Sequence, residues 1–309
     1  MSRRLLPFFS FVVAALTRAG TVGPFGVSSF PRKAHFFISY GIAFYFFASP
    51  DILPPIMDLK AFDLWCRSFL AIDELRQVDS SLNGVQVGRS GTPLELVAFA
   101  VDACAESIRR ARAAGAQVLF VHHGIFWGKP ARVEGPLLER IRLLLEADMA
   151  LYACHLPLDK HPELGNNALL ARRIGLKDLR PFGEYHGVEI GLRGVLEPKL
   201  GLDEIARRVI PDGSRPASLI PGAASEIGSV AVISGGAAME AFQALEAGMD
   251  LYVTGESSHS VYHAVLEGGM AFLAAGHYAT EVWGVRAVAE RLSRETGVKT
   301  AFIDLPTGL

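Results

Sequence analysis

The pattern of apolar and polar positions along this chain occurs twice, once near its middle and once near its end. In both copies, short apolar runs predict buried strands, and longer amphipathic stretches between them predict helices. The first copy spans residues 96–159 and the second spans residues 229–281. Because β-α-β units place their strands in parallel, we expect an α/β fold of two similar, interleaved lobes, each built on a β-α-β-α-β repeat.

Polar side chains follow the ends of the predicted strands in both copies. Ligands of parallel sheets gather beyond the carboxyl ends of the strands, so we expect these side chains to meet. In each copy, one histidine precedes a carboxylate by four residues. The full set is His122, His123, His155 and Asp159 in the first copy, and Glu256, His277 and Glu281 in the second.

A subset of these residues is typical of a site for divalent transition metals, because it combines neutral nitrogen donors with carboxylates. It consists of His122, His123, Asp159, His277 and Glu281. A single histidine taken alone is more simply a structural one, and no spacing here is a zinc signature. Neighbouring residues of a strand point apart, so His122 and His123 would more easily serve two metals than one. A bridging carboxylate, for which we favour Glu281, would hold two ions about 3.5–4 Å apart.

Five motifs that contain these residues occur in order from about Met57 to the end of the chain. They are SLNGVQVG (81–88), VHHGIFWG (121–128), HLPLDKHPELGNNALLA (155–171), TGESSH (254–259) and GHYATE (276–281). Together they resemble the signature of the Nif-three-like dinuclear metal centre family, also known as GTP cyclohydrolase I type 2 homologues. The resemblance implies a homohexameric ring of two-lobed subunits, each with two divalent ions (Zn, Fe, Mn or Ni) on the same five ligands.

Three further residues lie in matching motifs and are our candidates for catalysis. Glu256 is the candidate proton shuttle, and His155 or His259 would stabilise an oxyanion. His155 has the alternative of orienting a water or a ligand as a neighbour of the metal site. Ser260 stands where the family pattern often has a second histidine, which weakens any role that needs both.

Two classes of function fit this pattern. Two divalent ions can activate water and polarise an electrophile, which is the chemistry of hydrolases, and the resemblance implies opening of the GTP ring at a C–N bond. Apart from the resemblance, nothing indicates a nucleotide, since the chain has no GxxxxGK[ST] loop. The alternative is a non-catalytic metal-binding ring that acts as a regulatory or partner-binding scaffold, in which five protein ligands leave few open positions.

Length and composition allow one large or two medium domains, since the 309 residues are 50% hydrophobic. We expect an N-terminal extension (1–56), a first lobe (57–184), a small connecting α+β segment (185–228) and a second lobe (229–309). A net charge of −2 offers no electrostatic footprint for nucleic acid. The cysteines, Cys66, Cys104 and Cys154, lie in apolar stretches and are expected to be reduced, which favours the cytoplasm.

The extension contains two apolar runs, LLPFFSFVVAAL and FFISYGIAFYFFA, each shorter than the roughly 20 residues that span a bilayer. It is a targeting segment, a membrane-associating hairpin, or sequence upstream of the biological start. We favour Met57 as the start, with a disordered or loosely helical extension and no stable membrane span. Directly after it, Leu59, Phe62, Cys66 and Phe69 recur at helical spacing.

Several polar residues are predicted to have local roles. Asn166 and Asn167 precede an apolar stretch and are predicted to cap a helix at its N-terminus. Thr280 is predicted to cap the last amphipathic helix. Asn83 and Gln86 either bind a substrate or form hydrogen bonds within their own loop.

Overall fold

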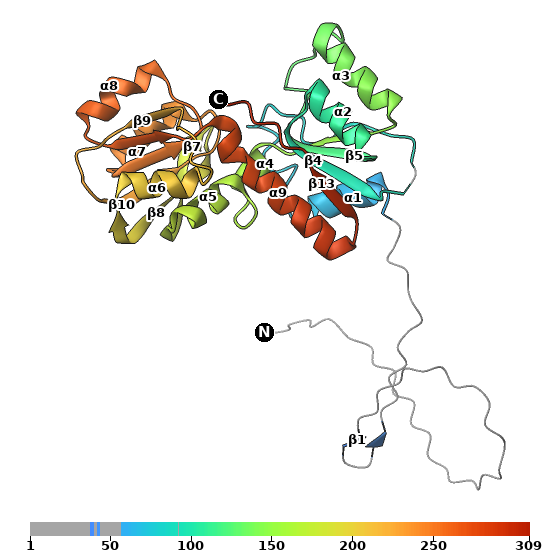
Figure 1. Ribbon diagram of the computed structural model, residues 1–309, viewed down its shortest axis with the longest axis horizontal. Coiled ribbons are helices and arrows are strands. Elements are labelled where there is room, and N and C mark those ends of the chain that lie inside the picture. The colour runs from blue at the N-terminus through green and yellow to red at the C-terminus, as the bar shows by residue number, and fades with distance from the viewer. Residues whose placement is uncertain (1–37, 40–41, 44–56, 92) are drawn as a thin grey trace, which may run out of the picture. The chain divides into compact units, whose positions relative to one another are not determined.

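The computed structural model describes residues 38–39, 42–43, 57–91 and 93–309 (Figure 1). Strands β1 (Ile38–Ser39) and β2 (Ile42–Ala43) pair antiparallel. Our expectations for the rest of the extension, including most of its two apolar runs, lie outside the described residues. In the described part of the chain, no helix combines the length and the apolar character needed to cross a membrane.

The first lobe is built on a five-stranded sheet with the order β13-β4-β5-β6-β3. The central strands run parallel, and β3 joins the edge antiparallel to β6. The strands are β3 (Gly84–Val87), β4 (Leu96–Asp102), β5 (Val118–His123), β6 (Ala150–Ala153) and β13 (Lys299–Phe302). The helices of this lobe are α1 (Leu59–Arg67), α2 (Ala105–Ala113) and α3 (Gly135–Glu146). Helix α1 buries Phe62 and Cys66, as its periodicity predicts.

The second lobe is built on a six-stranded sheet with the order β7-β8-β10-β11-β12-β9. Its three central strands are parallel, like those of the first copy. The strands are β7 (Lys177–Tyr185), β8 (Val188–Leu200), β9 (Ser218–Ile220), β10 (Ile227–Val232), β11 (Leu251–Thr254) and β12 (Ala271–Ala274). The helical elements are α6 (Leu202–Val209), the 3₁₀ turn η1 (Ala238–Glu240), α7 (Ala241–Glu246) and α8 (His259–Glu267). The predicted connecting segment therefore contributes two strands, β8 and β9, to this sheet.

Helix α9 (His277–Thr296) makes the two lobes interleave, because it follows the last parallel strand of the second sheet and leads back to the first. It runs between the two sheets in Figure 1, close to α4 (Leu156–Lys160) and α5 (Asn166–Ile174). Val285, Val288 and Leu292 are fully buried against the first sheet, and each contributes about 1.5–3 kcal/mol to stability. Trp283 packs against the cores of both lobes. The predicted α/β fold with two interleaved lobes is confirmed.

The prediction that Asn166 and Asn167 cap a helix is wrong. Gly165 is the N-cap residue of α5, and both asparagine side chains are buried in the first turn. Their amides form hydrogen bonds of 2.7–2.8 Å with other elements, which a buried amide requires. These bonds connect Asn166 to Gly284 and Asp159, and Asn167 to Ile190 and Ser234. Both residues therefore connect elements that surround the predicted metal site.

The prediction that Thr280 caps the last helix is also wrong, although the helix itself is present. Gly276 is the N-cap residue of α9, and Thr280 lies in the first turn. The hydroxyl of Thr280 accepts a hydrogen bond from the N–H of Gly235 at 3.0 Å, which ties the helix to the loop after β10.

Candidate metal centre

Four histidines share one arrangement, in which Nδ1 lies within hydrogen-bond distance of a fixed oxygen. Such a partner holds the proton on Nδ1 and leaves the lone pair of Nε2 available to a metal. The partners are the carbonyl of Cys154 for His122 (2.9 Å), Asp102 for His123 (2.8 Å), Asp79 for His155 (2.9 Å) and Glu256 for His277 (2.6 Å). The four rings are thus oriented by the protein before any ligand binds.

The topology of the two sheets brings these histidines together. His122 and His123 end β5, and His155 follows β6 at the N-cap position of α4. His277 follows β12 as the first residue of α9. The ring of His123 lies 4.6 Å from that of His122 and 5.1 Å from that of His277, measured between ring centres. Residues from both copies therefore meet beyond the carboxyl ends of the parallel strands.

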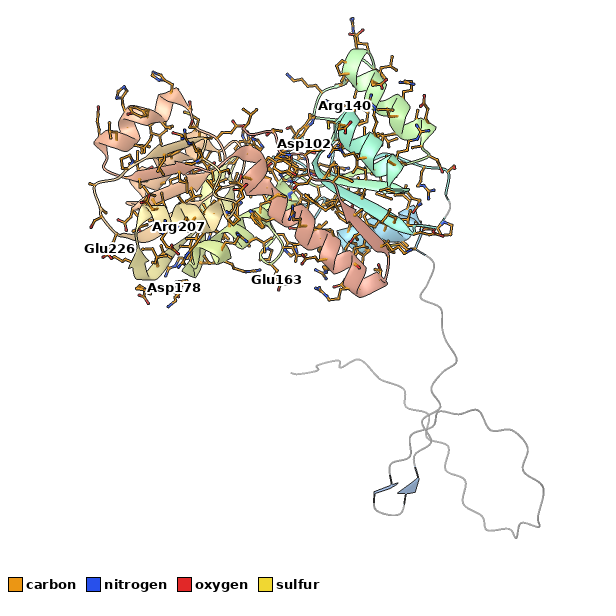
Figure 2. The ribbon with its side chains drawn as sticks, in the orientation of Figure 1. Asp102, Arg140, Glu163, Asp178, Arg207 and Glu226 are labelled. Atoms are coloured by element: carbon orange, nitrogen blue, oxygen red, sulfur yellow. The ribbon has the colours of Figure 1, made fainter. Side chains whose placement is uncertain are left out.

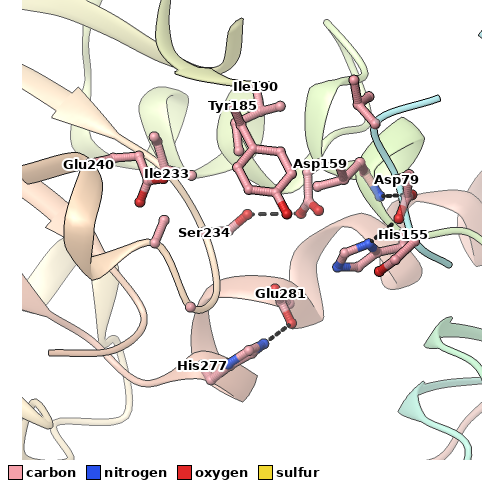
Figure 3. Close-up of a pocket in the computed structure, with 15 residues that line it drawn as sticks. Asp79, His155, Asp159, Tyr185, Ile190, Ile233, Ser234, Glu240, His277 and Glu281 are labelled. Carbon is pink, nitrogen blue, oxygen red and sulfur yellow. Dashed lines mark hydrogen bonds and ion pairs between the residues drawn. The ribbon is translucent and has the colours of Figure 1, made fainter. Parts of the chain in front are cut away.

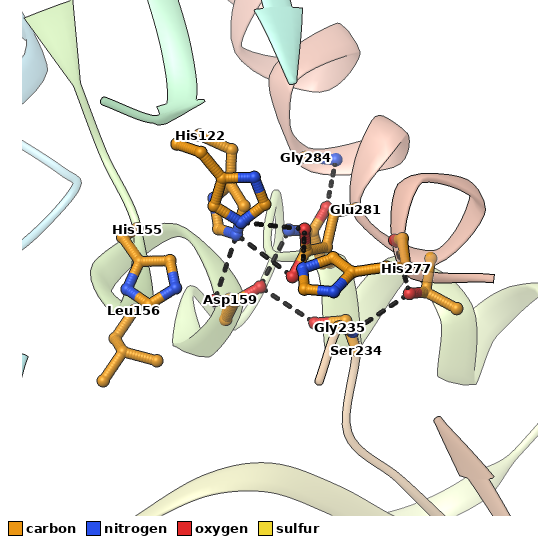
Figure 4. A network of polar contacts seen from close by, with 12 residues as sticks. His122, His155, Leu156, Asp159, Ser234, Gly235, His277, Glu281 and Gly284 are labelled. Atoms are coloured by element: carbon orange, nitrogen blue, oxygen red, sulfur yellow. Dashed lines mark hydrogen bonds and ion pairs between the residues drawn. The ribbon is translucent and has the colours of Figure 1, made fainter. Parts of the chain in front are cut away.

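Glu281 lies at the centre of this cluster and is 3% exposed (Figure 4). Its Oε1 is 3.4 Å from Nε2 of His122, and its Oε2 is 3.1 Å from Nε2 of His123 and 3.0 Å from Nε2 of His277. Despite these distances, Nε2 of His122, Nε2 of His277 and Oε2 of Glu281 have no hydrogen-bond partner among the described residues. Buried polar atoms without partners are costly, and a cation between them would satisfy the nitrogens and the carboxylate together.

Asp159 is the second buried carboxylate of the cluster. Its Oδ1 accepts hydrogen bonds from Asn166 and from the hydroxyl of Ser234, both at 2.8 Å. Its other oxygen, Oδ2, lies 3.4 Å from Nε2 of His122. One oxygen is therefore held by the protein, while the other faces the cluster.

Three groups of side chains are close enough to hold a metal ion. In each group, one ligand atom per residue lies within 4.8 Å of the others. The groups are His122, Asp159 and Glu281; His123, His277 and Glu281; and His122, His123 and His155. Two of them share Glu281, as expected of a bridging residue.

The charges of the cluster are strongly coupled. Burial acts to raise the pKa of Glu281, but the neighbouring His122, His123 and His277 outweigh it and hold that pKa well below its usual range. In turn, burial acts to lower the pKa of His277, but Glu281 and Glu256 outweigh it and raise that pKa to about 9. The carboxylates thus attract positive charge to the cluster, which a proton or a metal ion can supply.

Gly235 allows the loop after β10 to approach Glu281. A Cβ atom at this position would lie 2.1 Å from Oε1 of Glu281, and the residue has a φ of +69°. A larger residue here would displace the carboxylate.

A pocket of about 250 Å³ opens over the cluster (Figure 3). One end is formed by Asp79 and His155, and His277 and Glu281 form part of its floor. A small molecule in this pocket would therefore contact the candidate ligand residues.

The structure brings together most of the residues expected at this site. All five predicted metal ligands belong to the three groups, and so does His155. Glu256 contacts the cluster through His277. His259 is exposed at the start of α8 and, among the described residues, belongs neither to these groups nor to the pocket lining.

Two carboxylates of the site were missed by the sequence reasoning. Asp102 ends β4, so its place at a strand end could have revealed it. Asp79 precedes the SLNGVQVG motif and had no such signal. Asn83 accepts a hydrogen bond from the N–H of His155, and Gln86 accepts one from that of Ile125, so both form structural bonds that hold the loops at this site.

Comparisons with known proteins identify the family and the fold. A model of the family described as Duf34/NIF3 (NGG1p interacting factor 3) matches residues 57–307. A protein named GTP cyclohydrolase 1 type 2 homolog from Treponema pallidum is 40% identical over 286 residues, which cover 82% of this chain and 100% of that protein. A protein of the same name from Pyrococcus abyssi is 44% identical over 234 residues, which cover 75% of this chain and 92% of that protein. The crystal structure of TTHA1606 from Thermus thermophilus matches with a TM-score of 0.74 at 38% identity, covering 82% of this chain and 100% of that one.

Proposed function

The chain belongs to the Duf34/NIF3 family, and we propose that it binds two divalent metal ions and acts as a metal-dependent hydrolase. One observation carries this proposal: the two oxygens of Glu281 face different imidazoles, and neither contact has the geometry of a hydrogen bond. One ion would be held by His122, Asp159 and Glu281, and the other by His123, His277 and Glu281. Zinc, iron, manganese and nickel all suit this set of nitrogen and oxygen donors.

The number of ligands favours an enzyme over a non-catalytic scaffold. Three protein ligands for each ion, with Glu281 shared, leave coordination positions open, as in catalytic zinc sites. The pocket over the cluster gives a small molecule access to those positions. Bound divalent ions would polarise an electrophile and lower the pKa of water. The relatives are named after a cyclohydrolase, so hydrolysis of a C–N bond in a nitrogen heterocycle is the reaction we propose.

The protein's own groups would position the substrate and move protons. Asp79 holds His155 so that its Nε2 is available at the edge of the pocket, where its lone pair can complete the metal site. When Nε2 also carries a proton, it can instead donate to a developing oxyanion. Glu256 holds His277 through Oε1 and is half exposed, so its other oxygen is available as the proton shuttle. The role proposed for His259 stays a prediction.

Elemental mass spectrometry on the full chain, purified without added metal, tests the metal site. We expect about two divalent ions per chain. Turnover of C–N substrates that falls in Glu256→Gln when metal is added until both sites are filled would support the catalytic role. Folded protein without metal would overturn the proposal, and metal without turnover would leave the scaffold alternative.

The assembly, location and start of the protein are further proposals. The family resemblance favours a homohexamer, and analytical ultracentrifugation would measure the oligomeric state. The three free cysteines favour the cytoplasm. The match of the family model begins at residue 57, which is consistent with Met57 as the start. The intact mass of the protein from its native cells would test that start.

A further inference from the structure

The pocket over the metal cluster contains one carboxylate that has no partner. Four acidic residues line the pocket, namely Asp79, Asp159, Glu240 and Glu281. The first two accept hydrogen bonds, and Glu281 faces the imidazoles. The side chain of Glu240 makes no hydrogen bond or ion pair with any described residue, although it is half-buried. A carboxylate in this position is available to accept hydrogen bonds from a ligand.

Glu240 lies at the far end of the pocket from the metal cluster. It ends the 3₁₀ turn η1, whereas Asp79 and His155 form the opposite end (Figure 3). A single molecule that fills the pocket would therefore present one end to the metal cluster and the other to Glu240.

The wall between these two ends is apolar and preformed. It is lined by Tyr185, Ile190 and Ile233. The side chain of Ile233 packs against two glycines. A Cβ atom added at Gly183 would lie 2.2 Å from this side chain, and one added at Gly191 would lie 2.4 Å from it. Ile233 therefore fills the space beside both glycines, and together with Tyr185 it forms a wall that suits the face of a planar ring.

The size and charge of the pocket do not suit a nucleoside triphosphate. Its volume of about 250 Å³ is below the roughly 300–1,000 Å³ of pockets for drug-sized ligands. Triphosphates are usually held by Arg or Lys side chains, and none lines this pocket among the described residues. The unpaired carboxylate of Glu240 would repel a phosphate group. The base alone, without its sugar and phosphates, fits these constraints better.

We propose that this pocket binds a small planar nitrogen heterocycle that carries an amino group and no phosphate, and that Glu240 accepts hydrogen bonds from that amino group. The opposite edge of the ring then faces the metal cluster. As a choice of substrate, this inference rests on the proposed function, but the contact with Glu240 is independent of bound metal.

Calorimetric titration of the full chain at neutral pH tests this proposal with adenine and purine, which are both uncharged there and differ only in the amino group. We expect the amino compound to bind about tenfold more tightly, the effect of one hydrogen bond to a charged group. Glu240→Gln should remove most of this preference, because the amide that replaces the carboxylate is uncharged. Glu246→Gln, which changes an exposed residue of the same lobe away from this pocket, should retain it.

A second pair of probes, guanosine and GTP, tests the exclusion of phosphates. These two compounds are compared on protein stripped of metal, because bound divalent ions would themselves coordinate phosphates. There, GTP should bind no more tightly than guanosine. Binding of GTP about tenfold tighter than guanosine, or an amino preference that is absent or survives in Glu240→Gln, would overturn the inference.

The same titrations on protein stripped of metal separate this inference from the proposed function. An amino preference that persists without metal supports the role of Glu240 even if the purified protein proves to contain no ions. Two bound ions without any amino preference would overturn the inference and leave the metal site intact.

Discussion

The two copies of the repeat place a carboxylate at the same position of the fold, but they use it differently. In the first copy, Oδ1 of Asp159 is held by Asn166 and Ser234, so only Oδ2 faces the cluster. In the second copy, both oxygens of Glu281 face imidazoles. The longer side chain of glutamate lets one residue reach two groups of ligands, whereas the aspartate reaches one.

The two copies also differ at the end of their second strand, which is β5 in the first copy and β11 in the second. In the first copy, His122 and His123 stand there and face the cluster directly. In the second copy, Glu256 follows the strand and orients His277 from outside. A repeat thus gives residues equivalent positions, while side-chain length and hydrogen bonding decide what each one does.

The largest expected effect distinguishes the two carboxylates. Glu281→Gln should remove both ions, because each ion loses the shared ligand, whereas Asp159→Asn should remove about one. Metal content per chain, measured by elemental mass spectrometry, gives the result. Equal losses in the two variants would contradict the bridging role of Glu281.

The next effect concerns the loop that approaches Glu281. Gly235→Ala and Gly248→Ala both place a side chain at positive φ, at +69° and +66°, and this backbone strain should cost each variant about 1–2 kcal/mol in chemical unfolding. Only the Cβ at Gly235 meets Glu281, since no described atom lies within 4 Å of the one at Gly248. Metal loss should therefore be confined to Gly235→Ala, and similar loss in both variants would show that backbone strain alone is responsible.

A smaller effect tests how the two copies cooperate on one ion. Asp102 comes from the first copy and Glu256 from the second, yet they hold His123 and His277, which belong to the same group. Asp102→Asn and Glu256→Gln should each lower the affinity for one ion by about 10- to 100-fold, measured in competitive chelator titrations.

The control for these two substitutions is Glu295→Gln, a change near the end of α9 and away from the cluster. It should leave both affinities unchanged. If Asp102→Asn lowered the affinity for both ions, the assignment of the two ions to separate groups of ligands would be contradicted.

The smallest expected effect is a dependence of metal affinity on pH. The pKa of His277 in the folded protein, about 9, lies above its ordinary value of 6.5. In the metal-free protein at neutral pH, this ring is therefore the imidazolium, which carries a proton on Nε2 as well as on Nδ1. A metal must displace that proton, so affinity should rise as pH increases from about 7 towards 9 and fall as pH decreases. Calorimetry in buffers of different ionisation enthalpy counts the protons released. Release of none at neutral pH would contradict the raised pKa.

The sequence by itself determined the α/β repeat and the candidate ligands. The periodicity of apolar residues is a local property, and parallel strands direct their carboxyl ends to one edge. The positions of His122, His277 and Glu281 at the cluster follow from these two facts. The resemblance to a family rests on the same residues.

Only the tertiary structure decided how the side chains of the site are held and what the pocket can accept. Asp79 meets His155, and Gly284 meets Asn166, across 76 and 118 positions of sequence. The role of Glu240 likewise depends on a pocket whose walls come from distant segments. Local patterns carry no information about such pairs, because they form only when segments distant in the sequence pack together.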